Sequence, residues 1–161
     1  MAEFLTWCEE RKNMILIREM TLQDVEQVHE LEKLAFSMPW SRQDFVDAVE
    51  NKDSLYLVAE ETEYSGKVIA CCGMRSIVGE GDISNVSVHP DKRQRGIAGK
   101  MLAELLKRGE EEYGVEAYTL EVRKSNAAAI KLYSRLGFTE EGVRKNFYEK
   151  PVEDAIIMWK R

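Results

Sequence analysis

The side chains with the clearest chemical potential lie in one basic stretch, Ser87–Leu102. Four cations fall within nine residues of a chain whose formal net charge is −6: Lys92, Arg93, Arg95 and Lys100. The small residues Gly96, Ala98 and Gly99 leave the backbone open where a helix should begin. A helix N-terminus presents unpaired N–H groups and a partial positive charge, which suit a phosphate or pyrophosphate. The stretch therefore predicts an anion site, with a solvated helix start as the alternative.

The two common nucleotide-binding motifs do not fit this loop. A P-loop needs Gly-x-x-x-x-Gly-Lys-Ser/Thr, but Met101 follows Lys100 and no glycine lies five residues before Gly99. The dinucleotide-binding fingerprint also fails, because the glycine spacing differs and the next acidic residue does not end a second parallel strand.

Composition excludes several other classes of protein. The chain has 161 residues, 44% of them hydrophobic and 32% charged, which indicates one globular domain. The adjacent Cys71 and Cys72 are typical of small buried hydrophobes, with an acyl-accepting or redox thiol as the alternative. Two histidines without metal-ligand spacing predict no metal site, and no serine nucleophile elbow is present.

The charge balance and the absence of long apolar runs bear on partners and location. A pI of about 5.1 argues against nucleic-acid binding and suits a cationic substrate. No run reaches the length of a membrane span, and residues 1–13 lack the apolar core of a secretory signal. We expect a cytoplasmic protein with no membrane partner, acting as a monomer or weak dimer.

Hydrophobic periodicity predicts a mixed α/β sheet with helices on both faces. Capping boxes at Thr21–Asp24 and Ser41–Asp44 start the first two helices, and Trp40 and Phe45 form a hydrophobic staple. Three consecutive strands should form an antiparallel meander. We expect strands at 14–18, 55–59, 67–74, 82–88, 115–122, from 138 onward and at 154–159. We expect helices at 21–35, 41–51, 97–113 and about 129–136.

Two segments together resemble the GNAT acyltransferases. The stretch Val88–Gly99 is similar to the coenzyme A pyrophosphate loop of that family, Gln/Arg-x-x-Gly-x-Gly/Ala, with Arg93, Gly96 and Ala98 at the three positions. The segment Leu120–Phe138 resembles the C-terminal half of the family, in particular the RimI-type protein N-terminal alanine acetyltransferases. Further likeness to that subfamily lies at Met38–Ser41 and Asp154–Met158.

The resemblance spans residues 14–159 and implies the GNAT fold. That fold is a mixed, mostly antiparallel central sheet of about six to seven strands, with helices on both faces. We therefore expect one GNAT domain over 14–161 and an N-terminal extension over 1–13.

The resemblance also implies acetyl-CoA as co-substrate and no metal. Loop N–H groups would hold the pyrophosphate, and the edge of the strand ending at Val88 would hold the amide-rich pantetheine arm. The thioester would lie where that strand splays from the strand 115–122, near an N–H able to polarise its carbonyl. Asn126 matches a CoA-contacting asparagine, with a helix N-cap as its alternative role. The expected cofactor-binding residues are Val86, Ser87, Val88, Arg93, Gln94, Arg95, Gly96, Ile97, Ala98, Gly99 and Asn126.

For the chemistry, Glu121 matches the general base of the RimI type and Tyr133 the general acid that protonates the leaving thiolate. Without the resemblance, Glu121 reads equally as a surface residue and Tyr133 as core packing. Trp40 and Tyr148 are the expected substrate contacts, although Trp40 also serves the staple.

The implied reaction is transfer of acetyl from acetyl-CoA to a protein α-amine, most simply the N-terminal alanine of a small-subunit ribosomal protein. Acetylation of lysine or small-molecule amines is the first alternative. A non-catalytic acyl-CoA-binding or peptide-binding module is the second.

Overall fold

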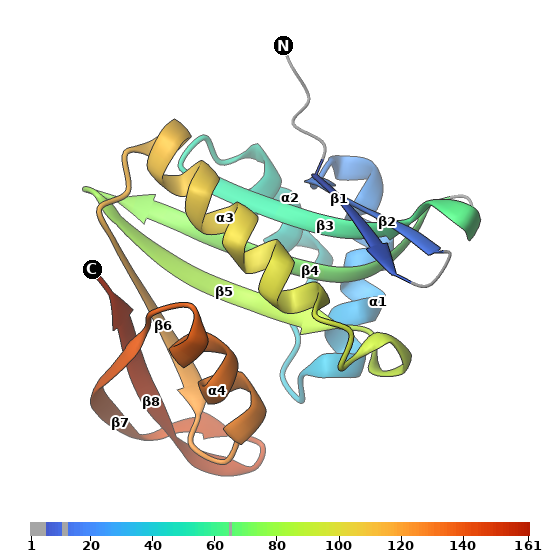
Figure 1. The fold of residues 1–161 in the computed structure, drawn as a ribbon. Helices are drawn as coiled ribbons and strands as arrows, with labels where there is room; N and C mark the ends of the chain where they lie inside the picture. The colour runs from blue at the N-terminus through green and yellow to red at the C-terminus, as the bar shows by residue number, and fades with distance from the viewer. Residues whose placement is uncertain (1–5, 11–12, 65) are drawn as a thin grey trace.

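The computed structural model describes residues 6–10, 13–64 and 66–161 (Figure 1). The strands are β1 (Thr6–Glu10), β2 (Asn13–Glu19), β3 (Ser54–Glu61), β4 (Lys67–Ile77), β5 (Glu80–Val88), β6 (Ala117–Arg123), β7 (Thr139–Glu149) and β8 (Val152–Lys160). The helices are α1 (Val25–Ala35), α2 (Arg42–Glu50), α3 (Ile97–Tyr113) and α4 (Ala127–Arg135). No helix in this part of the chain is long and apolar enough to cross a membrane.

The eight strands form one sheet in the order β1-β2-β3-β4-β5-β6-β8-β7. Among the described strands only β5 and β6 pair in parallel, and every other neighbouring pair is antiparallel. Strands β2 to β8 supply seven strands, as expected for the GNAT fold. The meander of β3, β4 and β5 is confirmed. Strand β1 lies within the segment 1–13 and adds an outer strand beside β2.

Helices cover both faces of the sheet (Figure 1). Helices α3 and α4 bury the larger apolar cluster, which includes Leu102, Leu105 and Tyr133. Helices α1 and α2 bury the smaller cluster on the opposite face, around Phe45 and Val58. Cys71 and Cys72 alternate between these two clusters and are buried, as predicted for small hydrophobes in a strand.

Local signals in the sequence explain where the helices begin and end. The capping boxes at Thr21–Asp24 and Ser41–Asp44 both form, although the first opens a short 3₁₀ turn, Leu22–Asp24, that leads into α1. The Trp40 and Phe45 rings of the staple lie 5.3 Å apart. Gly114 ends α3 in the left-handed conformation with φ 64°, a conformation that glycine adopts without steric cost.

The central feature of the sheet is the divergence of β5 from β6. The two strands pair only from Glu80–Asp82 to Ala117–Thr119, and they separate beyond those residues. The pairing of β5 with β4 is also irregular beyond Asp82. The register shifts between Cys71 and Gly73 on β4, which lie opposite Ser87 and Ser84 on β5. Asn85 has a positive φ of 59° there, and the Tyr56 ring packs so closely on Gly73 that a Cβ would lie 2.3 Å from it. This irregularity bends the free half of β5 away from β6.

Candidate functional site

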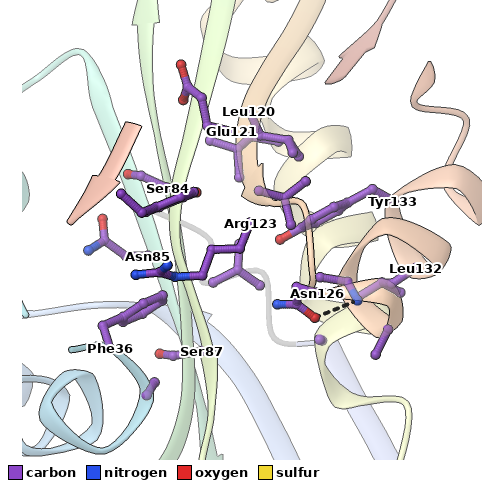
Figure 2. A pocket seen from close by; sticks show the side chains of 18 of the residues that line it. Phe36, Ser84, Asn85, Ser87, Leu120, Glu121, Arg123, Asn126, Leu132 and Tyr133 are labelled. Carbon is purple, nitrogen blue, oxygen red and sulfur yellow. Dashed lines mark hydrogen bonds between the residues drawn. The ribbon is translucent and has the colours of Figure 1, made fainter. Parts of the chain in front are cut away.

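A cavity of about 710 Å³ opens where β5 and β6 separate. Its walls come from the free half of β5, the end of β6, α4, the end of β7, the last residue of α1 and the segment 36–38 that follows it (Figure 2). Segments far apart in the chain therefore meet at one point. The predicted site residues among its walls are Val86, Ser87, Val88, Arg93, Ala98, Glu121, Asn126, Tyr133 and Tyr148.

Glu121 lies on the face of β6 that is turned away from the α3–α4 core. The alternation of β6 buries Tyr118, Leu120 and Val122, so Glu121 points to the other side and borders the cavity with a side chain 26% exposed. The Arg144 guanidinium on β7 lies 3.6 Å from its carboxylate. The carboxylate is thus neither a free surface group nor a core group, and it is within reach of a ligand in the cavity.

Tyr133 lies on α4 and is 7% exposed, with its ring against Phe138 at 6.0 Å. It belongs to the core cluster and also lines the cavity, so core packing is compatible with a position next to a bound ligand. Burial, and then the nearby Cys72 and Tyr148, raise the pKa of its phenol well above the ordinary value. The phenol therefore stays protonated at neutral pH and can donate a hydrogen bond or a proton.

The free edge of β5 offers backbone donors to the cavity. His89 donates its main-chain N–H to the Ile69 carbonyl on β4 at 2.8 Å, so the N–H of its neighbour Val88 points away from β4 and toward the gap. The Arg93 Nε donates to the Val88 carbonyl at 3.1 Å on that open side. An extended amide chain can pair with such an edge.

The basic loop leads into α3 as expected. Gln94 and Gly96 have φ values of 63° and 75°, and Ala98 is helical, as predicted. Helix geometry leaves the N–H groups of Ile97, Ala98 and Gly99 without a carbonyl partner inside the helix. The loop therefore presents a row of main-chain donors to an anion.

The residues of this loop differ in their surroundings. Lys92 forms an ion pair with the buried Glu61 at 2.7 Å, and this contact helps to hold the loop in place. Ile97 is buried in the core, so only its main chain can meet a ligand. Gln94, Arg95 and Gly96 are exposed and lie outside the walls of the cavity, as does Gly99, which faces Leu132.

Asn126 caps α4, because its Oδ1 accepts the Ala129 N–H at 3.1 Å (Figure 2). The same exposed side chain borders the cavity, so the cap leaves its amide NH₂ available. The two roles considered for Asn126 are therefore compatible.

The two expected substrate contacts differ in position. Tyr148 lines the cavity, stacks under the Arg123 guanidinium at 4.3 Å and packs edge-on against Phe147 at 5.1 Å. Burial, and next the negative charge of Glu121, raise the pKa of Tyr148 above its ordinary value. Trp40 lies outside the cavity walls and packs on Phe45 and Tyr56.

The model of the acetyltransferase (GNAT) family matches residues 25–138. This chain belongs to the GNAT acetyltransferase family. The matched segment contains the diverging strands, the basic loop, Glu121 and Tyr133, and the family uses acyl-CoA as its donor.

Individual relatives place the enzyme within the RimI type. A ribosomal protein bS18-alanine N-acetyltransferase of Escherichia coli is 37% identical over 147 residues, which are 90% of this chain and 96% of the relative. The protein of that description from Salmonella typhimurium is 38% identical, covering 84% of this chain and 89% of the relative. The crystal structure of the Escherichia coli ribosomal-protein-S18-alanine N-acetyltransferase matches with a TM-score of 0.82 and 33% identity, over 91% of this chain and 93% of that one.

This GNAT enzyme also has cavity residues that the sequence did not single out. They include Phe36 after α1, Ser84 and Asn85 at the irregular part of β5, and Arg123 on β6. A polar Ser-Asn pair inside a strand was the available signal, because asparagine tolerates a positive φ better than most residues. The ion pair of Arg144 with Glu121 was not predicted either, since the two residues lie on strands that are distant in sequence.

The cap and the cofactor contact of Asn126 can be separated by mutation. Asn126→Ala should lower the free energy of unfolding by about 1 kcal/mol, because the Ala129 N–H loses its acceptor. Urea unfolding measures this loss. Asn126→Ser keeps a capping oxygen and serves as the control, so its stability should be near that of the parent. A raised KM for acetyl-CoA in the serine variant would assign a cofactor contact to the amide, and an unchanged KM would leave only the cap.

Proposed function

We propose that this enzyme transfers acetyl from acetyl-CoA to the N-terminal α-amine of a protein, with the N-terminal alanine of ribosomal protein bS18 as its substrate. The observation that carries the proposal is that Glu121 and Tyr133 border one cavity at the divergence of β5 and β6. The activity described for the relatives supports the same choice of substrate. Residues 14–161 would act as the catalytic domain, as a monomer or weak dimer in the cytoplasm, where ribosomal proteins are made.

We infer that acetyl-CoA would extend from the start of α3 into this cavity, which Arg93 and Ala98 border. The N–H groups at the start of α3 would receive the pyrophosphate, and the free edge of β5 would receive the amides of the pantetheine arm. That arrangement brings the thioester between Val88 and Tyr133. The Val88 N–H would then donate to the thioester carbonyl and stabilise the oxyanion that forms during attack.

An α-amine suits a site with one modest base. Its pKa of about 8, against about 10.4 for lysine, leaves it neutral on the order of 100 times more often at pH 7. Glu121 would accept the proton from the amine as the new N–C bond forms, directly or through one water. The positive Arg144 guanidinium, 3.6 Å from the Glu121 carboxylate, would oppose the approach of a protonated amine.

The leaving group completes the proton balance. As the C–S bond of the thioester breaks, the sulfur of CoA takes the electron pair and needs one proton. The Tyr133 phenol holds a proton at neutral pH and lies on the helix that borders the thioester end of the cavity. It would therefore serve as the general acid. The buried Cys71 and Cys72 lie outside the cavity walls and have raised pKa values, which favours direct transfer over an acyl-cysteine.

The substrate assignment is tested by release of free CoA thiol from acetyl-CoA. We expect turnover with a short peptide carrying the bS18 N-terminus, and little with the same peptide blocked at its α-amine or with a free lysine side chain. Mass spectrometry should place the acetyl group on the first residue. Faster turnover on polyamines would favour the small-molecule alternative. Tight CoA binding without turnover on any amine would favour a binding module.

Replacing Glu121 tests the base. Glu121→Gln should lower kcat by about 10²–10⁴-fold, because the amide cannot accept the amine proton. The KM for acetyl-CoA should change little, since the pyrophosphate loop and the edge of β5 are untouched. Steady-state kinetics at neutral pH measure both constants. A kcat equal to that of the parent would return Glu121 to the class of surface residues.

Replacing Tyr133 tests the acid. Tyr133→Phe keeps the ring packing against Phe138 but removes the proton, so kcat should fall by about 10²-fold or more while the urea midpoint changes little. In the parent, kcat/KM should rise with pH as the amine loses its proton near pH 8 and should show no descending limb below about pH 9.5. A descending limb is not expected in this range because the raised pKa of Tyr133 keeps the phenol protonated to higher pH. Loss of stability without loss of kcat would assign Tyr133 to packing alone.

A further inference from the structure

A second carboxylate lies buried behind the cavity and is not needed for the chemistry described above. Glu32 on α1 is 3% exposed. Its Oε1 accepts a hydrogen bond from the Asn85 Nδ2 at 3.0 Å, and its Oε2 has no hydrogen-bond partner in the described part of the chain. A buried carboxylate with an unpaired oxygen is costly, and an apolar side chain would fill the same space without that cost. The cost indicates a role beyond packing.

Asn85 is the residue at the irregular part of β5 that borders the cavity. Its φ of 59° lies in the left-handed region, which most residues other than glycine and asparagine avoid, and its side chain is held from two directions. Tyr56 donates its hydroxyl to the Asn85 Oδ1 at 2.9 Å, while the Asn85 amide donates to Glu32. The bonds to Tyr56 and Glu32 thus hold the part of β5 that directs Val86–Val88 toward the cofactor.

The other neighbour of Glu32 is the segment between α1 and α2, here called the α1–α2 loop (residues 36–41). Glu32 lies in the last turn of α1, and its main-chain carbonyl accepts the N–H of Phe36, the first residue of the loop, at 2.9 Å. The Trp40 ring of this loop packs on the ring of Tyr56 on β3, with 5.9 Å between the ring centroids. The loop is therefore in contact with the residue that donates to Asn85. Phe36 and Met38 of the same loop line the cavity.

We propose that Glu32 is a positioning residue that ties the β5 irregularity at Asn85 to the α1–α2 loop. It holds the strand that carries the thioester and the loop that borders the amine in one relative position. This inference rests on the proposed function, because it assumes that the amine enters beside the α1–α2 loop. It also gives Trp40 a role: the residue acts on substrate binding through the position of its loop and not by touching the amine.

The first test compares variants that remove the link in different ways. Glu32→Leu removes both acceptor oxygens and should lower kcat about 10–100-fold, because small misplacements of reacting groups have effects of that size. Glu32→Gln retains one acceptor oxygen and should lose less. Asn85→Gly accepts the positive φ but removes the side-chain bonds, so it should behave like Glu32→Leu. The double variant should be no worse than either single variant, since both remove one link.

The matched control is Asp24→Asn. Asp24 is likewise a buried carboxylate, 4% exposed, but it pairs with Arg18 and lies outside the cavity walls. Its variant should lose stability and keep its kcat per folded molecule. If Glu32→Leu and Asn85→Gly also lose only stability, Glu32 has a structural role and the proposal is wrong. Should Glu32→Leu fail to fold, the kcat of Asn85→Gly decides.

A second measurement is independent of the amine substrate. CoA alone should slow amide hydrogen exchange in the α1–α2 loop of the parent, although this loop is separate from the loop expected to hold the pyrophosphate. That slowing should be lost in Asn85→Gly at saturating CoA. Equal protection in parent and variant would overturn the link even if the parent proved inactive on the bS18 peptide. Loss of protection together with normal peptide acetylation would separate the link from catalysis and overturn the positioning role.

Discussion

The whole site depends on the short parallel pairing of β5 with β6. After three paired residues on each strand, the two separate, and the backbone groups on the facing edges have no partner in the sheet. Unpaired N–H and C=O groups inside a protein need partners, so this opening is suited to a ligand that is itself rich in amides. The pantetheine arm of CoA has that chemistry. Every catalytic assignment proposed for this GNAT enzyme follows from placing a thioester in the opening.

The divergence of β5 and β6 also brings different residues to the opening from the two faces of the sheet. The face covered by α3 and α4 provides the anion-binding helix start and the buried Tyr133. The opposite face carries Glu121 and lies beside the α1–α2 loop. In the proposed reaction, the cofactor and the amine would approach the opening from opposite sides and meet at the carbonyl. The proposed base on one side and the proposed acid on the other match the direction in which the proton and electron pair would move.

Local sequence signals predicted the elements well because they depend on neighbours in the chain. The capping boxes, the Trp40 staple, the Gly114 helix end and the alternation in β6 are all interactions within a few residues. The long-range assignments of Glu121 and Tyr133 had a different source, the family resemblance, since pattern alone left each with a plain structural alternative. Family membership is shown by the comparisons, and the roles of these two residues remain predictions.

What the sequence by itself determined is the order of the elements, the apolar faces that build two cores, and the small basic helix start fit for an anion. Only the tertiary structure decided that Lys92 is taken up by Glu61, that Asn85 stands at the irregular part of β5, and that Arg144 lies beside Glu121. It also showed that Glu32 links two segments more than fifty residues apart in the chain. The physical reason is that helix and strand periods report which face a side chain occupies, whereas ion pairs and buried hydrogen bonds depend on which faces meet.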